Sequence, residues 1–432
     1  MSRPCETAWW QPRLAVPAGA GAPERSRGGA PVWCLALFTC VLILSPQSWI
    51  PALVPFRLAL VAGVLAVAAL LLDRARRGLA VLAPTTGVTI AGLLFFWGLV
   101  TIPFSEWPGG SLAFLLGPFL KTLVVFWLLA AVIDDAGRLR RICGWLFLLS
   151  LPLSMTALVH FATGVTVPEG APGAPRIAGF NAPLTDNPND LALMLNLMIP
   201  VGIAMAQIAR GTALRWSYTA LVVLAALGVI ATFSRGGFLT LGAILAIFLW
   251  RHRGKGAAVA AAAALAVVAF AAAPSGYLRH MTTIADIASD TTGSAQERWH
   301  DMAASLSVAA QDPLFGAGIG MNALALNEQR GDAWRMVHNV YLQYAVDLGL
   351  PGLALFLALL ARSLRLSGAA RRAAPDHPRS RETSILGGAI QTSLIAFCVA
   401  AMFHPVAYNA YFFYFAGLAE SLPSVLGGET AG

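Results

Sequence analysis

Three short polar segments interrupt an otherwise apolar chain and hold residue types that could do chemistry. The first holds Arg235 beside two glycines, the second holds Arg298, and the third holds His338. Arginine presents a planar fork of N–H groups that pairs well with phosphate oxygens. A neutral imidazole can accept the proton of an attacking hydroxyl. If these three side chains meet, they suit a site that binds a diphosphate and activates a hydroxyl.

Each of the three residues also has an ordinary structural interpretation. Arg235 fits an interfacial arginine that reaches lipid phosphate, Arg298 fits a solvated charge on a helix, and His338 fits a structural histidine at a helix N-terminus. The functional interpretation is favoured because all three residues fall on the same, outer face of the topology predicted below.

Five further polar residues are weaker candidates for contacts with a donor or an acceptor. They are Lys121, Arg176, Asn187, Asn189 and Asn339. Lys121 falls near the middle of an apolar run, where a charge is costly, so we expect it to face the bundle interior or a cavity. Asn187 and its neighbours are typical of the cap of the apolar helix that follows. The histidines and cysteines lack metal-ligand spacing, so we expect neither a metal nor another cofactor.

The composition indicates which kind of protein must position these residues. The chain has 432 residues, of which 57% are hydrophobic and 12% are charged, and its mean hydropathy is +0.69. Soluble domains carry about 25% charged residues. This composition excludes a soluble enzyme, a disordered chain and an ordinary nucleic-acid-binding protein. The predicted fold class is therefore an all-α integral membrane protein.

Twelve apolar runs approach the roughly 20 residues that a helix needs to cross a membrane. They are Trp33–Ile50, Phe56–Leu72, Pro84–Ile102, Gly110–Ile133, Ile142–Phe161, Leu191–Ala209, Ser217–Phe233, Phe238–Trp250, Ala257–Ala273, Asn339–Leu360, Ile385–Phe403 and Ala407–Val425. Most of the 29 lysines and arginines fall in the N-terminal tail and in alternate loops. Because basic loops stay in the cytoplasm, this pattern predicts that both termini are cytoplasmic.

The predicted spans divide the chain into five parts. These are a disordered cytoplasmic tail (1–32), nine spans (33–273), an outer loop with a helical subdomain (274–338), three spans (339–425) and a second cytoplasmic tail (426–432). In the outer loop, a capping box at Ser294 and an apolar stripe of Trp299, Met302 and Leu306 predict a helix that lies on the membrane surface and ends near Asp312. The glycine-rich segment after it follows no strand, so we interpret it as a loop and not as a dinucleotide site.

Six short motifs, in this order, resemble those of the O-antigen ligase and polymerase superfamily. They occupy residues 187–192 (NPNDLA), 232–237 (TFSRGG), 298–299 (RW), 312–318 (DPLFGAG), 338–343 (HNVYLQ) and 349–352 (GLPG). The resemblance covers about residues 175–360. It implies a GT-C-type glycosyltransferase fold in the bacterial inner membrane, with about 12 transmembrane helices and one long periplasmic loop.

The resemblance also implies an activity and roles for the candidate residues. The implied enzyme is a metal-independent, inverting ligase that moves a glycan from undecaprenyl diphosphate to a lipid A–core sugar or a similar hydroxyl at the periplasmic face. Arg235 and Arg298 match the arginines that contact the diphosphate in this superfamily, and His338 matches the proposed general base or acceptor-orienting residue. Arg176 falls in the loop where polymerases place a sugar-binding arginine.

Two groups of alternatives remain open. Within the superfamily, the chain could be a repeat-unit polymerase or an O-oligosaccharyltransferase that glycosylates protein. From another class, twelve spans are also typical of a transporter. Against a transporter, charges within the spans are few, and the sequence has no inverted repeat with broken helices.

Overall fold

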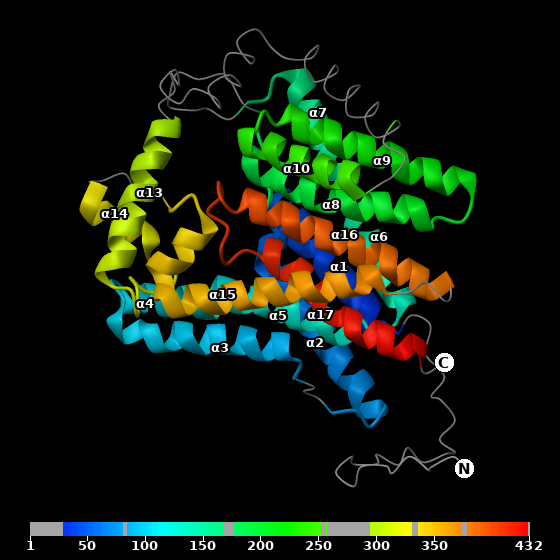
Figure 1. The fold of residues 1–432 in the computed structure, drawn as a ribbon, viewed down its shortest axis with the longest axis horizontal. Coiled ribbons are helices and arrows are strands. Elements are labelled where there is room, and N and C mark those ends of the chain that lie inside the picture. Colours follow the sequence, from blue (N-terminus) through cyan, green and yellow to red (C-terminus); the bar gives the residue numbers. More distant parts are fainter. Residues whose placement is uncertain are drawn as a thin grey trace, which may run out of the picture.

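The computed structural model describes residues 29–80, 84–166, 177–251, 256, 294–330, 336–373 and 378–430. Within these ranges every regular element is a helix (Figure 1). The α-helices are α1 (Ala30–Leu44), α2 (Leu58–Arg76), α3 (Thr86–Thr101), α4 (Pro108–Phe114), α5 (Leu120–Val132), α6 (Ala136–Leu148), α7 (Ser150–Thr163), α8 (Pro188–Ile208), α9 (Thr212–Ala231), α10 (Arg235–Arg251), α13 (Ser294–Gln311), α14 (Asn322–Arg330), α15 (Val340–Arg372), α16 (Pro378–Ala400) and α17 (Ala410–Thr430). Short helical turns are η1 (Pro46–Ser48), η2 (Pro51–Phe56), η3 (Ile102–Phe104) and the π-helical η4 (Leu115–Phe119).

In the described part of the chain, nine helical segments are long and apolar enough to cross a membrane. They are Ala30–Ser48, Pro51–Arg76, Thr86–Phe104, Pro108–Val132, Ala136–Thr163, Pro188–Ile208, Thr212–Ala231, Val340–Arg372 and Ser380–Ala400. Each overlaps a predicted span, so the prediction of an all-helical integral membrane protein is confirmed.

The three other predicted spans differ from these nine. Phe238–Trp250 lies within α10, which has 17 residues and is slightly short for a crossing. Ala407–Val425 overlaps α17, which is helical and contains Glu420 and Pro423. Ala257–Ala273 lies outside the described residues. The total of twelve spans therefore stays a prediction.

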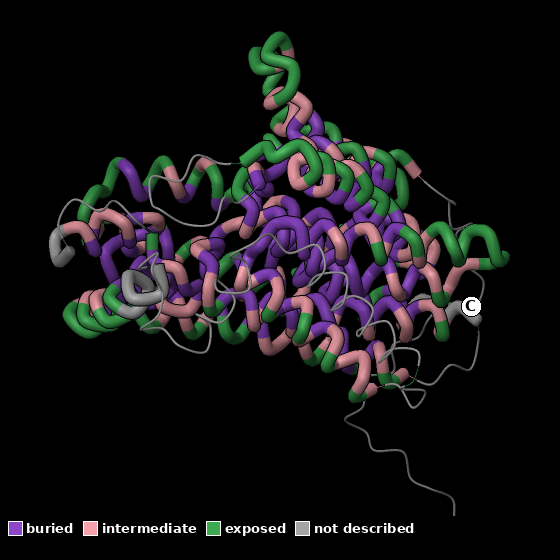
Figure 2. The backbone as a smooth tube through the Cα atoms, turned by 90° about the horizontal axis from the view of Figure 1, so that it is seen from above, coloured by how far each residue is buried: buried purple, intermediate pink, exposed green. Residues whose placement is uncertain are grey.

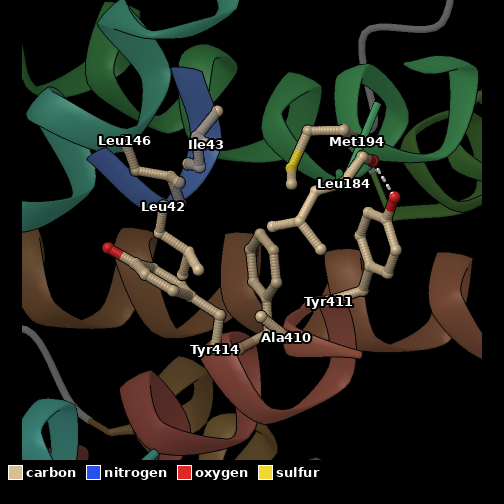
Figure 3. Close-up of a pocket in the computed structure, with 9 residues that line it drawn as sticks. Leu42, Ile43, Leu146, Leu184, Met194, Ala410, Tyr411 and Tyr414 are labelled. Atoms are coloured by element: carbon tan, nitrogen blue, oxygen red, sulfur yellow. Dashed lines mark hydrogen bonds between the residues drawn. The ribbon is translucent and has the colours of Figure 1, made fainter. Parts of the chain in front are cut away.

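The bundle interior is closely packed, and its buried residues gather along the middle of the molecule (Figure 2). The aromatic first turns of α17 insert among α1, α6 and α8, where the hydroxyl of Tyr411 donates to the carbonyl of Leu184 (Figure 3). A cavity of about 10 Å³ remains beside Tyr411, Leu42 and Met194. It is apolar and has room for one water molecule at most, so it is a packing defect and not a ligand site.

A glycine divides α15 and thereby shapes the end of the bundle that carries the candidate residues. Gly349 has φ +65°, and a Cβ there would lie 2.3 Å from the carbonyl oxygen of Leu314. Only glycine fits both the left-handed backbone and this close approach. Residues 340–348 form a short first part of α15, and residues 350–372 form the long second part. α13 and α14 stand beside the first part, at the end of the bundle away from the last turns of α17 (Figure 1).

A second apolar cluster fastens α13 and α14 to the start of α15. Its buried members are Ala309, Ala317, Met321, Ala325, Leu326, Val337, Ala345 and Val346. The predicted helix in the outer loop is confirmed, since α13 begins at Ser294 and ends at Gln311.

The face that α13 buries differs from the predicted apolar stripe. Met302 and Leu306 are 36% and 64% exposed, whereas Asp301, Ser305 and Ala309 of the same helix are buried. α13 turns this face inward because it meets the turn before α15, where Asp301 finds a polar partner. Met302 and Leu306 are therefore on the side of α13 that faces away from the bundle, and the predicted placement of this helix on the membrane surface stays a prediction.

Candidate functional site

His338 lies in the turn before α15, next to Asp301 of α13. Nδ1 of His338 is 3.9 Å from Oδ2 of Asp301, and the two side chains are 34% and 9% exposed. This separation is longer than a hydrogen bond, so the carboxylate acts on the imidazole through its charge. The pair can therefore accept a proton from a hydroxyl that approaches the exposed side of the ring. Sequence reasoning missed Asp301, although its position three residues after Arg298 puts both residues on neighbouring positions of one helix face.

Backbone contacts on both sides hold the His338 turn in place. The N–H of Val337 donates to Oδ1 of Asn322 at 3.0 Å, and the N–H of Val340 donates to the carbonyl of Ala401 at 2.8 Å. Oδ1 of Asn339 accepts from the N–H groups of Tyr341 and Leu342 at 3.0 and 3.1 Å. Asn339 is thus the N-cap of α15. Its predicted contact with a donor or an acceptor stays a prediction.

Asn322 is in turn held by a fully buried carboxylate. Oδ1 of Asp347 accepts from the backbone N–H of Asn322 at 2.7 Å, and Oδ2 accepts from its side-chain amide at 3.0 Å. Both residues are buried. A buried carboxylate is costly unless it accepts hydrogen bonds. Because Asn322 supplies these donors, it is held in one position against Asp347. Asp347 and Asn322 therefore act as positioning residues for the segment that carries His338.

The glycine-rich segment 316–320 packs against the bend of α15. Gly316, Gly318 and Gly320 all have positive φ, between +68° and +99°. The N–H of Gly318 donates to the carbonyl of Asp347 at 2.9 Å, and the N–H of Leu350 donates to the carbonyl of Pro313 at 2.7 Å. The segment is a loop, as predicted, and it fixes the direction of the short first part of α15.

Arg235 opens α10 after a strained turn. Phe233 has φ +53°, and Ser234 is fully buried. Oγ of Ser234 accepts from the N–H of Gly237 at 3.1 Å, so Ser234 caps the helix. Arg235 itself is half-buried. A guanidinium in the first turn adds to the partial positive charge of a helix N-terminus, and the combination suits an anion.

Asn187 and Asn189 connect α8 to the Arg235 turn. Oδ1 of Asn187 accepts from the N–H groups of Asn189 and Asp190, both at 2.9 Å, which confirms the predicted cap of this helix. Oδ1 of Asn189 accepts from Oγ of Ser234 at 2.8 Å. The two asparagines therefore position α8 and α10, and their predicted contacts with sugar stay predictions.

The end of α16 links the Arg235 turn to the His338 turn. The carbonyl of Ala401 accepts from Val340, two residues after His338. A Cβ on Gly236, next to Arg235, would lie 3.1 Å from Cε1 of His404. Segment 400–404 thus borders both turns, and Arg235 and His338 lie at the same end of the bundle.

Three candidates remain, namely Lys121, Arg176 and Arg298. Lys121 is exposed on the outside of α5, whereas its neighbours Thr122 and Leu123 are buried. Its two neighbours occupy the inward positions of that turn, so Lys121 does not lie in the packed interior of the bundle, and its predicted place in a cavity stays a prediction. Arg298 belongs to α13, and the structure describes its backbone only. Arg176 is not among the described residues. The meeting of Arg235, Arg298 and His338 around one hollow stays a prediction.

The region that contains the Arg235 and His338 turns is similar to a known protein family. Residues 220–357 match the family model described as O-Antigen ligase. No curated protein matches the chain. A solved structure described as "Structural coordination of polymerization and crosslinking by a peptidoglycan synthase complex" is similar over 81% of this chain and 98% of that chain, with 18% identity and a TM-score of 0.42. A likeness with this TM-score supports no statement about activity. The matched region includes Arg235, Asp301, His338 and Asp347.

Proposed function

We propose that this chain, which belongs to the O-antigen ligase superfamily, transfers a glycan from undecaprenyl diphosphate to a hydroxyl of a lipid A–core sugar or similar acceptor. The observation that carries the proposal is the pair of His338 and Asp301, held beside the same segment as the Arg235 turn. An enzyme that moves a glycosyl group needs a base for the acceptor and positive charge for the leaving group. The two turns supply these groups at one end of the bundle.

In the proposed reaction, the acceptor oxygen forms a bond to the anomeric carbon while the bond from that carbon to the diphosphate oxygen breaks. Nδ1 of His338 faces Asp301, so Nε2 takes the proton of the hydroxyl. Attack opposite the leaving group inverts the anomeric centre. Arg235 and Arg298 then stabilise the negative charge that develops on the departing undecaprenyl diphosphate. In this proposal His338 acts on the acceptor, and the two arginines act on the leaving group.

The proposed location is the bacterial inner membrane, with the site on the periplasmic side. Support comes from two helices that begin beside the site. α10 starts at Arg235 and ends at Arg251, and α15 starts after His338 and ends at Arg371 and Arg372. Since basic helix ends stay in the cytoplasm, these arginines favour a site that faces the periplasm.

Analysis of the glycans that accumulate without the protein tests the proposal. In a ligase, removal of the gene leaves full-length chains on undecaprenyl diphosphate, because polymer forms and cannot be transferred. In a polymerase, removal leaves single repeats on the same carrier. Gel separation of the lipid-linked glycans distinguishes the two. Unchanged glycans on both carrier and acceptor would contradict a role in either step.

A further inference from the structure

A groove between α3 and α15 lies away from the candidate site and has no part in the proposed reaction. It encloses about 440 Å³, which is in the range of small-molecule sites. Its lining includes Thr86 and Ile90 from α3 and Ala358, Arg362, Arg365 and Leu366 from α15. The walls are thus mainly apolar, and two arginines stand on one side.

The two arginines of the groove differ in their partners. Arg362 forms a two-point ion pair with Glu420 of α17, with Nη2 2.8 Å from Oε1 and Nε 2.9 Å from Oε2. Glu420 is almost fully buried, so the charge of Arg362 is balanced inside the bundle. Arg365 is exposed, and among the described residues no acidic side chain pairs with it. The groove therefore presents one unbalanced positive charge beside apolar walls.

The position of the groove along α3 places it at the basic end of the bundle. The far end of α3 lies by the candidate site, where Nε1 of Trp97 donates to the carbonyl of Leu348 at 2.8 Å. Thr86 and Ile90 form the first two turns of α3, directly after the segment that follows α2 and its terminal arginines. From Thr86 to Thr101 a helix rises about 24 Å, which is most of a hydrocarbon core of roughly 30 Å. The groove thus lies near the opposite membrane surface.

We propose that this groove binds an anionic phospholipid of the leaflet on the basic side. The lipid phosphate pairs with Arg365, and an acyl chain runs along Ile90, Ala358 and Leu366. Basic pockets between transmembrane helices on the cytoplasmic side suit such head groups. α3 lies at the edge of the bundle (Figure 1), and the lining residues Ala358 and Arg365 are exposed, so the surrounding lipid can reach the groove. A soluble anion would meet the same arginine but would leave the apolar walls uncovered, which favours a lipid.

Lipid binding to the purified full chain in a neutral detergent tests this proposal. Native mass spectrometry and thermal unfolding are measured with phosphatidylglycerol, with phosphatidylcholine and with inorganic phosphate. We expect phosphatidylglycerol to bind and to raise the melting temperature, and the other two to have little effect. Arg365→Gln removes the charge and Ala358→Trp fills the groove. Each variant is expected to weaken phosphatidylglycerol binding about tenfold. Arg365→Gln loses a charge-assisted contact with the phosphate, and Ala358→Trp excludes the acyl chain from the groove.

Two matched variants serve as controls. Arg372→Gln removes an exposed arginine of the same helix outside the groove, and Leu357→Trp enlarges an exposed neighbour of Ala358 that does not line it. Both are expected to bind phosphatidylglycerol like the wild type. Equal binding by all four variants would overturn the proposal, as would an equal effect of phosphatidylcholine. If inorganic phosphate raises the melting temperature as much as phosphatidylglycerol does, the ligand of the groove is a free anion and the lipid proposal is wrong. None of these measurements depends on glycan transfer, so they are independent of the proposed activity.

Discussion

Oδ2 of Asp301 lies 3.9 Å from Nδ1 of His338, across the boundary between α13 and the first turn of α15. This contact joins a helix of the outer loop to the membrane-spanning bundle. It also accounts for the direction in which α13 faces, since the helix buries Asp301 and leaves Met302 and Leu306 exposed. The packing of α13 and the surroundings of His338 therefore depend on the same contact, which leads to the first two predictions.

His338→Ala is expected to lower glycan transfer by about 10²–10⁴-fold, because the acceptor hydroxyl loses its base. The measurement is transfer from lipid-linked glycan to acceptor in membranes that contain equal amounts of protein. His300→Ala is the matched control, since His300 is an exposed histidine of α13. Equal transfer by the His338 variant and the wild type would end the proposed role of this residue.

Asp301→Asn is expected to lower transfer by about 10–100-fold, because it keeps the side-chain shape but removes the negative charge that stabilises His338 after it takes the proton of the acceptor. Asp301→Glu, which restores the charge, should recover part of the lost activity. Rates and melting temperatures of both variants are compared with those of the wild type. If Asp301→Asn and Asp301→Glu reduce transfer equally, the role of Asp301 is limited to the packing of α13.

Arg235→Ala is expected to lower transfer by about 10²–10³-fold, because one source of positive charge at the leaving diphosphate is lost. Arg235→Lys should be intermediate, since an ammonium keeps the charge but cannot pair at two points. Arg215→Ala, which removes an exposed arginine of α9, is the control and should transfer normally. Full activity in Arg235→Ala would show that the α10 turn has no part in the reaction.

Asn322→Ala is expected to lower the free energy of unfolding by about 2–3 kcal/mol, because the buried carboxylate of Asp347 loses side-chain donors and Val337 loses its acceptor. Transfer should fall as well, since the His338 turn is no longer held. Thermal unfolding and transfer are measured together. Gln311→Ala, at the exposed end of α13, should change neither quantity. A stable variant with normal transfer would remove Asn322 from the positioning network.

Gly349→Ala is expected to destabilise the protein by at least about 1–2 kcal/mol, because alanine is strained at φ +65° and its Cβ would press on the carbonyl of Leu314. Gly242→Ala is the matched control, since a Cβ at Gly242 in α10 meets no atom within 4 Å. There alanine should be neutral or stabilising by up to about 1 kcal/mol. The comparison of melting temperatures of the two variants checks both expectations.

The membrane class and most of the helices follow from the pattern of apolar residues along the chain. Runs of apolar residues cross a bilayer whatever their neighbours are, because the backbone must satisfy its own hydrogen bonds there. Local chemistry likewise determined the cap at Asn187 and the start of α13 at Ser294. The segment with glycines at 316, 318 and 320 was recognised as a loop because no strand precedes it.

Which polar side chains meet depends on how the helices pack against one another. The apolar stripe of Met302 and Leu306 gave no sign that the opposite face of α13 is buried, where Asp301 lies next to His338. Lys121 looked buried by its place in an apolar run, but the orientation of α5 turns it outward. Asp347 and Asn322 carried no local signal of their contact. The hydrophobic pattern predicts whether a residue prefers an apolar or a polar environment. A contact between two polar side chains also depends on a partner that is distant in the sequence and comes close only in the folded chain.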